Sequence, residues 1–230
     1  FVLWNTDAYD PAHGGWPPDA DPLYQSVPFV LSVVDDAFFG VLTDDPHRME
    51  VDLASSSPDA WTVTSIGGAI DQWVVLGPTP AEVVRRYTTL AGRTPLPPRW
   101  ALGYHQCRWG YRPADRLEAL AQEFRDRRFP ADALWLDIQH LDGFRTFTWD
   151  PAGFPDPAGL VERLAALGFK LVVIADPGIK AEPGWEPYDR GVAEDAFLHR
   201  ADGSWFVGTV WAGPSVFPDF TSPQGRAWWA

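Results

Sequence analysis

Two apolar stretches of this chain each run into an aspartate and then into a turn, and this repeated pattern constrains the fold more than any other feature. Residues 131–136 lead to Asp137, and residues 169–175 lead to Asp176 and then Pro177-Gly178. Nearly continuous apolar runs are typical of parallel strands that are buried on both faces. In a parallel α/β barrel, the carboxyl ends of the strands host the chemistry. We therefore predict that both aspartates are site carboxylates, although an aspartate at such a position can also serve only as a cap or turn residue.

Strands and helices alternate over the second half of the chain. We predict strands at residues 100–106, 133–138 and 170–175, with helices at about 114–127 and 157–167 between them. The strand-helix unit recurs about every 35 residues, so eight units would need on the order of 280 residues, near the usual barrel size of about 250. Because three strands cannot close a barrel, the chain is either part of a larger barrel protein or a small open α/β domain.

The first 92 residues have a different, all-β pattern. Short alternating or aromatic runs are separated by clusters of Pro, Gly, Asp and Ser, a spacing that suits a β-sandwich; the runs are 29–34, 38–43, 49–53, 61–65 and 71–76. A short helix follows at 79–87 with Thr79 as its cap. A stiff, proline-rich stretch at 92–98 then separates the two patterns. We predict part of a sandwich over 1–92 and the first part of a (β/α)8 barrel over 93–230.

The charge balance and the cysteine content limit the partners and the compartment. The net charge is −13, whereas nucleic acids and anionic membranes are bound by basic patches, so we expect neither as a partner. No apolar run reaches the roughly 18 residues that a membrane helix needs, and the start does not resemble a signal peptide. The single cysteine, Cys107, excludes an internal disulfide framework and slightly favours the cytoplasm over secretion.

Several motifs of common enzyme classes do not occur, but aromatic residues are abundant. The five histidines show no metal-ligand spacing, and the sequence has no P-loop, G-x-G-x-x-G or G-x-S-x-G motif. Thirteen tryptophans are well above ordinary usage. We expect about half of them in the core, but Trp109 follows the first barrel strand and Trp211 follows the third. Flat aromatic faces and acids at one rim indicate a carbohydrate pocket.

Motifs along essentially the whole chain resemble those of glycoside hydrolase family 31, which contains retaining α-glucosidases and related α-xylosidases. In order, they are LWNTDA at 3–8, GPTP at 77–80, PPRWALGYHQCRWGY at 97–111, FTWD at 147–150, DPG at 176–178, VWAGP at 210–214 and FPDF at 217–220. The resemblance implies a β-sandwich followed by a TIM barrel. It also implies an enzyme that needs no metal or organic cofactor.

The same resemblance implies a set of substrate-binding residues: Asp7, Trp109, Asp137, Ile138, Ile174, Asp176 and Trp211. Asp137 would bind hydroxyls at the far edge of the terminal sugar. Ile138, Ile174 and Trp211 would line its pocket, and Trp109 would stand beside the scissile bond. Asp7 would reach over the pocket on a loop of the sandwich. Gln139-His140-Leu141 departs from the family's more frequent Asp-Tyr-Met, so the surroundings of Asp137 differ from that pattern.

The family's nucleophile and acid/base aspartates have no counterpart in this sequence. The nucleophile belongs to a Trp-x-Asp-Met-Asn-Glu-Pro motif, which does not occur here. The chain therefore looks like a fragment with no catalytic carboxylate of its own, cut from an enzyme that releases terminal α-linked glucose with retention. The Asp137-Ile138 pair resembles α-glucosidases more than α-xylosidases, and an α-xylosidase or another α-glycosidase of the family stays the alternative. Other readings are a non-catalytic carbohydrate-binding protein and an open three-stranded domain with purely structural tryptophans.

Overall fold

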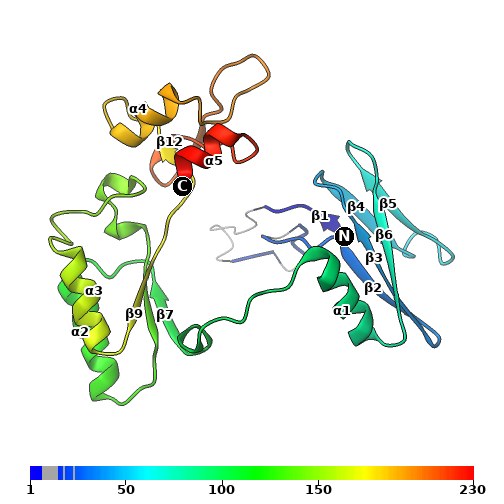
Figure 1. Ribbon diagram of the computed structural model, residues 1–230, viewed down its shortest axis with the longest axis horizontal. Helices are drawn as coiled ribbons and strands as arrows, with labels where there is room; N and C mark the ends of the chain where they lie inside the picture. The colour runs from blue at the N-terminus through cyan, green and yellow to red at the C-terminus, as the bar shows by residue number, and fades with distance from the viewer. Residues whose placement is uncertain (7–14, 18, 23) are drawn as a thin grey trace. The chain divides into compact units, whose positions relative to one another are not determined.

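The chain forms two compact units, Phe1–Pro95 and Leu96–Ala230 (Figure 1). The structure is a computed structural model and describes residues 1–230 except 7–14, 18 and 23. None of the helices in this described part is long and apolar enough to cross a membrane.

The N-terminal unit is built from two three-stranded antiparallel sheets. One has the order β1-β4-β5 and the other β2-β3-β6; the strands are β1 (Val2–Leu3), β2 (Phe29–Val34), β3 (Ala37–Thr43), β4 (Met49–Leu53), β5 (Trp61–Ser65) and β6 (Gln72–Gly77). Alternation predicts this half well, because each strand has one face toward the interior and Pro, Gly, Asp and Ser turns set its ends. Met49 and Val51, for example, are the buried residues of β4, and the residue between them is exposed.

Helix α1 (Pro80–Ala91) packs on the second sheet and begins where the sequence predicts. The Thr79 hydroxyl accepts a hydrogen bond from the Glu82 backbone N–H at 3.2 Å, which satisfies one of the free donors at the helix start. Val83 is fully buried against the sheet. Gly77 permits this approach, because a Cβ at that position would lie 2.8 Å from a Val83 methyl group. The helix continues four residues beyond the predicted end at residue 87.

The C-terminal unit contains the predicted parallel sheet, in the order β7-β8-β9. Its strands are β7 (His105–Arg108), β8 (Ala133–Leu136) and β9 (Lys170–Val173), and the connections carry α2 (Ala114–Asp126) and α3 (Pro157–Ala166). Each strand is thus followed, through a helix, by its parallel neighbour. Leu117 of α2, Leu134 and Leu136 of β8, and Leu160 of α3 belong to one buried cluster.

One predicted element is wrong at its start. Residues 100–106 were expected as one strand, whereas the 3-10 helix η1 (Arg99–Leu102) occupies the first part and β7 begins only at His105. Pro98 accounts for the difference, because its fixed φ and its carbonyl favour a turn there, and the Ala101 N–H bonds to that carbonyl at 2.9 Å. The strands expected at 133–138 and 170–175 also end two residues early, at Leu136 and Val173.

The region after β9, which is rich in proline and glycine, is not a long loop. It holds a small antiparallel sheet in the order β10-β12-β11 and two short helices; the elements are β10 (Ile179–Lys180), α4 (Glu186–Ala193), β11 (Gly208–Val210), β12 (Gly213–Val216) and α5 (Pro223–Trp229). Ile179, Phe197, Val216 and Trp228 form its own buried cluster. Composition misleads here because several of the glycines serve close packing: a Cβ on Gly191 would lie 2.1 Å from the Phe197 ring.

The buried cluster around β8 predicts which substitution destabilises the chain. Leu134 is fully buried in the central strand, so Leu134→Ala should lower the free energy of unfolding by about 2–5 kcal/mol through lost burial and the cavity left behind. Val161→Ala, on the exposed side of α3, is the matched control and should cost about 0.5 kcal/mol or less. Urea unfolding followed by tryptophan fluorescence measures both. Equal losses in the two variants would contradict the assigned core.

Candidate functional site

The pairing register of the parallel sheet brings the ends of its strands together at one edge. Arg108, Leu136 and Val173 lie side by side and are the last residues of β7, β8 and β9. The next residues along the chain are Trp109, Asp137 and Ile174. This edge, formed by the three strand ends and the residues that follow them, is called the strand-end edge below. It is where a parallel α/β sheet places functional side chains.

Asp137 occupies the strand-end edge as the cap of a 3-10 turn. It precedes η2 (Ile138–His140), and its Oδ1 accepts the backbone N–H of Ile138 at 2.7 Å. The side chain is only partly buried. An ionised carboxylate offers about four acceptor positions, so this bond leaves capacity for further donors. The capping role considered from the sequence is therefore real, and it is compatible with ligand binding.

Asp176 and Cys107 both experience the charge of Asp137. Burial raises the pKa of the Asp176 carboxyl, and the negative charge of Asp137 raises it further. The pKa of the Cys107 thiol is also raised, first by desolvation of the thiol, although the residue as a whole is exposed, and then by Asp137. A nearby negative charge disfavours the charged form of a carboxyl or a thiol. The charge of Asp137 therefore reaches both Asp176 and the thiol of β7.

His140 holds the backbone of Asp137 in place, a role that the sequence did not predict. Its ring is buried, and Nδ1–H donates to the backbone carbonyl of Asp137 at 2.8 Å. The ring also meets the Trp149 ring edge-on, with 4.9 Å between centroids. Burial lowers the pKa of His140, against the smaller opposing effects of the Asp137 carbonyl and charge. The i, i+3 spacing from Asp137 is the only sequence signal of this contact.

Thr146 joins the loop after β8 to the loop after β9. Its hydroxyl, in a buried side chain, donates to the backbone carbonyl of Asp176 at 2.9 Å. Arg145, the preceding residue, pairs with Asp142 at 3.0 Å and with Glu182 at 3.6 Å. These contacts tie the segment that carries Asp176 to the segment that follows Asp137. Nothing in the local sequence identifies Thr146, because its partner is 30 residues away.

The aromatic and aliphatic members of the predicted site fall into two groups. Ile138 is buried and Ile174 is partly buried, whereas Trp109 and Trp211 are each 69% exposed. Trp211 lies at the turn of the β11–β12 hairpin. The residue before it, Val210, packs on Gly178, since a Cβ there would be 2.8 Å from a Val210 methyl group. That contact holds the hairpin to the segment just after Asp176.

The last residue of the predicted site, Asp7, lies outside the described residues, so the structure does not place it.

In the part of the chain that the structure describes, no group of three or more His, Cys, Asp or Glu side chains could hold a metal ion. The strand-end edge carries two carboxyls and exposed aromatic faces, together with the exposed Arg108 at the end of β7. Carboxylates accept hydrogen bonds, so the hydroxyl groups of a neutral ligand can donate to them.

Two family models match the chain. The glycosyl hydrolases family 31 TIM-barrel domain matches residues 94–230. The glycosyl hydrolase 31 N-terminal galactose mutarotase-like domain matches residues 1–52. The predicted fold class, part of an N-terminal β-sandwich domain followed by part of a TIM barrel, is confirmed by these matches.

Proteins similar to this chain include several α-glucosidases. Alpha-glucosidase 2 of Bacillus thermoamyloliquefaciens is 40% identical over 229 residues, which are 100% of this chain and 28% of that protein. Neutral alpha-glucosidase AB of Homo sapiens is 47% identical over 164 residues, 71% of this chain and 17% of that protein. A crystal structure of glucosidase II alpha subunit in a DNJ-bound form superposes with a TM-score of 0.89 at 33% identity, over 99% of this chain and 26% of the other. Its alpha3-Glc2-bound and Glc1Man2-bound forms also match.

The chain spans about a quarter of the length of the first of these relatives. Within that span, the TIM-barrel model alone covers more than half of the chain's 230 residues. The chain therefore belongs to glycosyl hydrolase family 31.

Proposed function

We propose that this chain forms the sugar-binding part of a retaining α-glucosidase, an enzyme that releases terminal α-linked glucose from an oligosaccharide. The observation that carries the proposal is the placement of two carboxyls at the strand-end edge: Asp137 directly follows β8, and Asp176, whose pKa is raised by burial and by the charge of Asp137, follows β9. Its support is the identity of 40% to an alpha-glucosidase over the whole chain. The alpha3-Glc2-bound and Glc1Man2-bound forms of a relative agree with a glucosylated ligand.

In this proposal the chain's own residues bind and orient the sugar. Asp137 has acceptor capacity left after it caps η2, and that capacity would receive hydroxyl protons of the terminal glucose. Asp176 would accept a hydrogen bond from the same sugar. Because its pKa is raised, it is protonated more readily than an ordinary aspartate when a second acid lies nearby. Ile138 and Ile174 would exclude water from the sugar ring. Trp109 and Trp211 would offer exposed aromatic faces.

Bond cleavage needs a second set of groups. A retaining glycosidase uses two carboxyls about 5–5.5 Å apart: one attacks the anomeric carbon, and the other protonates the leaving oxygen and then activates water. No residue of this chain is assigned to either role, because the family's nucleophile motif does not occur in the sequence. Binding still contributes to rate wherever a contact to the sugar strengthens as the ring flattens toward the transition state.

A substrate screen separates this proposal from its alternatives. The full-length gene product is assayed on aryl α-glucoside, aryl α-xyloside and aryl α-galactoside. We expect the α-glucoside to be hydrolysed with the highest kcat/KM. A preference for the xyloside would assign another α-glycosidase activity. Binding of glucosides without turnover of any substrate would instead identify a carbohydrate-binding protein.

The 230-residue chain alone should hydrolyse no glycoside. Its residues supply binding but not the nucleophile and acid/base pair, and positioning cannot accelerate a step whose reacting groups are absent. Release of nitrophenol from p-nitrophenyl α-glucoside by the purified chain is compared with a buffer blank. Turnover above the blank that persists through repeated purification would contradict the assignment of roles.

Asp137→Asn in the full-length enzyme should lower kcat/KM about tenfold to a hundredfold or more. Asparagine keeps the shape and can still accept the Ile138 N–H, but it loses charge-assisted bonds worth about 1.5–3 kcal/mol each. Asp202→Asn is the matched control, since Asp202 bonds locally to Ser204 at 2.6 Å and should leave kcat/KM unchanged. Azide should not rescue the Asp137 variant. Formation of a glycosyl azide would show instead that Asp137 is the nucleophile, and full activity with unchanged KM would make it purely structural.

His140 should make the stability of the chain fall as the pH falls. Its pKa is lowered in the folded chain but near 6.5 when unfolded, so the unfolded state takes up the proton first as the pH drops from about 7.5 to 5.5. Unfolding then becomes easier, by at most about 1.4 kcal/mol per pH unit for one proton. His140→Asn keeps an amide donor for the Asp137 carbonyl and removes the titration. Urea unfolding at several pH values should give a shallower slope for the variant; identical slopes would exclude the buried, neutral ring.

A further inference from the structure

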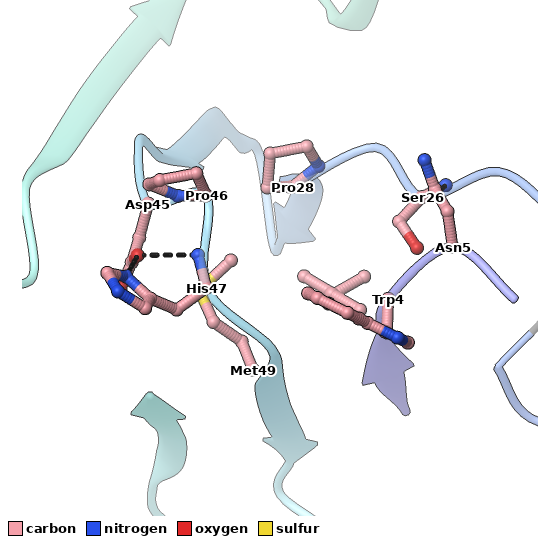
Figure 2. A pocket seen from close by; sticks show the side chains of 9 residues that line it. Trp4, Asn5, Ser26, Pro28, Asp45, Pro46, His47 and Met49 are labelled. Atoms are coloured by element: carbon pink, nitrogen blue, oxygen red, sulfur yellow. Dashed lines mark hydrogen bonds and ion pairs between the residues drawn. The ribbon is translucent and has the colours of Figure 1, made fainter. Parts of the chain in front are cut away.

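A pocket of about 330 Å³ lies on the N-terminal unit, between the end of β1, the segment before β2 and the turn that joins β3 to β4. Figure 2 shows Trp4 on one side of it and Asp45 with His47 on the other. Its volume is at the lower end of the range of about 300–1,000 Å³ found for small-molecule sites. Its lining combines apolar side chains, such as Pro28 and Met49, with a few polar ones, as binding sites do.

The polar wall of this pocket is built around Asp45. Its side chain is only 1% exposed, and its Oδ1 accepts both the backbone N–H of His47, at 2.9 Å, and the ring Nδ1–H, at 2.7 Å. The Ser65 hydroxyl and these two His47 groups lower the pKa of Asp45 to about 2. The Ser65 hydroxyl itself donates to the Gly67 carbonyl oxygen at 2.8 Å. Asp45 is therefore a charged, buried carboxylate, and the group that it orients is the His47 ring.

Contacts on two sides fix the orientation of the His47 ring, although much of its side chain is exposed. Its side chain is 44% exposed, yet its ring is held on one edge by Asp45. Glycines approach another part of the ring: a Cβ on Gly68 would lie 2.9 Å from ring Cε1, and one on Gly67 would lie 3.1 Å from Cδ2. With Nδ1 directed to the carboxylate, Nε2 is the ring nitrogen that remains for a ligand. A buried carboxylate that orients an exposed ring is the kind of support that preorganises a binding site.

The opposite wall presents an aromatic face with a hydroxyl beside it. Trp4 is 45% exposed, so a large part of its indole is open to a ligand. Asn5 is hydrogen-bonded to the segment before β2, because its Oδ1 accepts the backbone N–H of Ser26 at 2.8 Å. Ser26, which lines the pocket beside Trp4, contributes a hydroxyl that can donate or accept. The pocket thus offers one flat apolar face and hydrogen-bonding groups on both of its sides.

These features select the chemical class of the ligand. An anion is disfavoured, because the charge behind His47 is negative and the chain as a whole carries −13. A cation gains little, because both oxygens of the Asp45 carboxylate are covered: Oδ1 accepts two N–H bonds, and Oδ2 is buried although it has no hydrogen-bond partner among the described residues. A neutral ring with hydroxyls satisfies both walls: its C–H face packs on the indole, and one hydroxyl donates to an imidazole nitrogen.

We propose that this pocket binds a neutral monosaccharide in the pyranose form, with the sugar's C–H face on Trp4 and a hydroxyl donating to His47 Nε2. The proposal concerns residues of the N-terminal unit and does not depend on the α-glucosidase activity proposed above. Asp45 is the positioning residue, since it acts on the sugar only through His47.

The test is a titration of the 230-residue chain with D-glucose, followed by NMR at the His47 ring Cε1–H and the Trp4 indole N–H. Both signals should shift together and saturate in the millimolar range. Trp4→Ala should weaken the affinity read at His47 about tenfold or more, as loss of an aromatic anchor does. Trp73→Ala is the matched control, because Trp73 is 47% exposed in the same unit and does not line the pocket; it should leave the affinity unchanged.

Other ligands make the proposal easy to overturn. Sorbitol has the hydroxyls but no ring and should not shift either signal, whereas equal shifts with sorbitol would remove the role of the Trp4 face. Shifts from choline without shifts from glucose would identify a cation site and refute the sugar. Glucose-dependent shifts confined to Trp109 and Trp211 would also refute this pocket while supporting the proposed function at the strand-end edge. Because the wild-type signals decide the matter, the result does not depend on any variant folding.

Discussion

The in-register pairing of β7, β8 and β9 is the constraint on which the proposed site depends. Arg108, Leu136 and Val173 end their strands at the same level, so the chain can place Asp137 and Asp176 close enough for one charge to raise the pKa of the other. A slip of one residue in β8 would exchange its two faces. Leu134 and Leu136 would leave the buried cluster, and Asp137 would leave the strand-end edge. The same pairing register therefore both buries the leucines and places the acid.

The two acids at the strand-end edge differ in what surrounds them. The Ile138 N–H donates to the Asp137 carboxylate at 2.7 Å. Burial is the main cause of the raised pKa of Asp176, and the charge of Asp137 adds to it. The Thr146 hydroxyl donates to the Asp176 backbone carbonyl, so this bond fixes the backbone and does not involve the carboxyl. The two acids therefore have different environments although they arise from the same strand-end pattern.

Local patterns predicted most of the strands and helices, and they failed where distant contacts decide. The strands at 29–34, 49–53 and 61–65 agree with the structure to the residue, because alternation and turn residues act locally. The 3-10 turn before β7 depends on hydrogen bonding to a proline carbonyl, and the small sheet after β9 depends on glycines that admit Phe197 and Val210. Neither contact leaves a periodic signal. In the same way, Asp137 and Asp176 could be predicted as strand-end acids, but His140 and Thr146 could not be assigned their supporting roles.

The two histidines discussed here show how a partner decides what an imidazole does. His140 is buried, and its Nδ1–H meets a neutral carbonyl. Burial therefore outweighs the attraction to a proton, its pKa falls, and the ring serves as fixed support under Asp137. His47 is half-exposed, and its Nδ1–H meets a carboxylate that is itself buried. The buried charge then belongs to Asp45, and the His47 side chain stays 44% exposed. A sequence shows a histidine near an aspartate in both cases, but only the burial of each partner separates a structural ring from one that can receive a ligand.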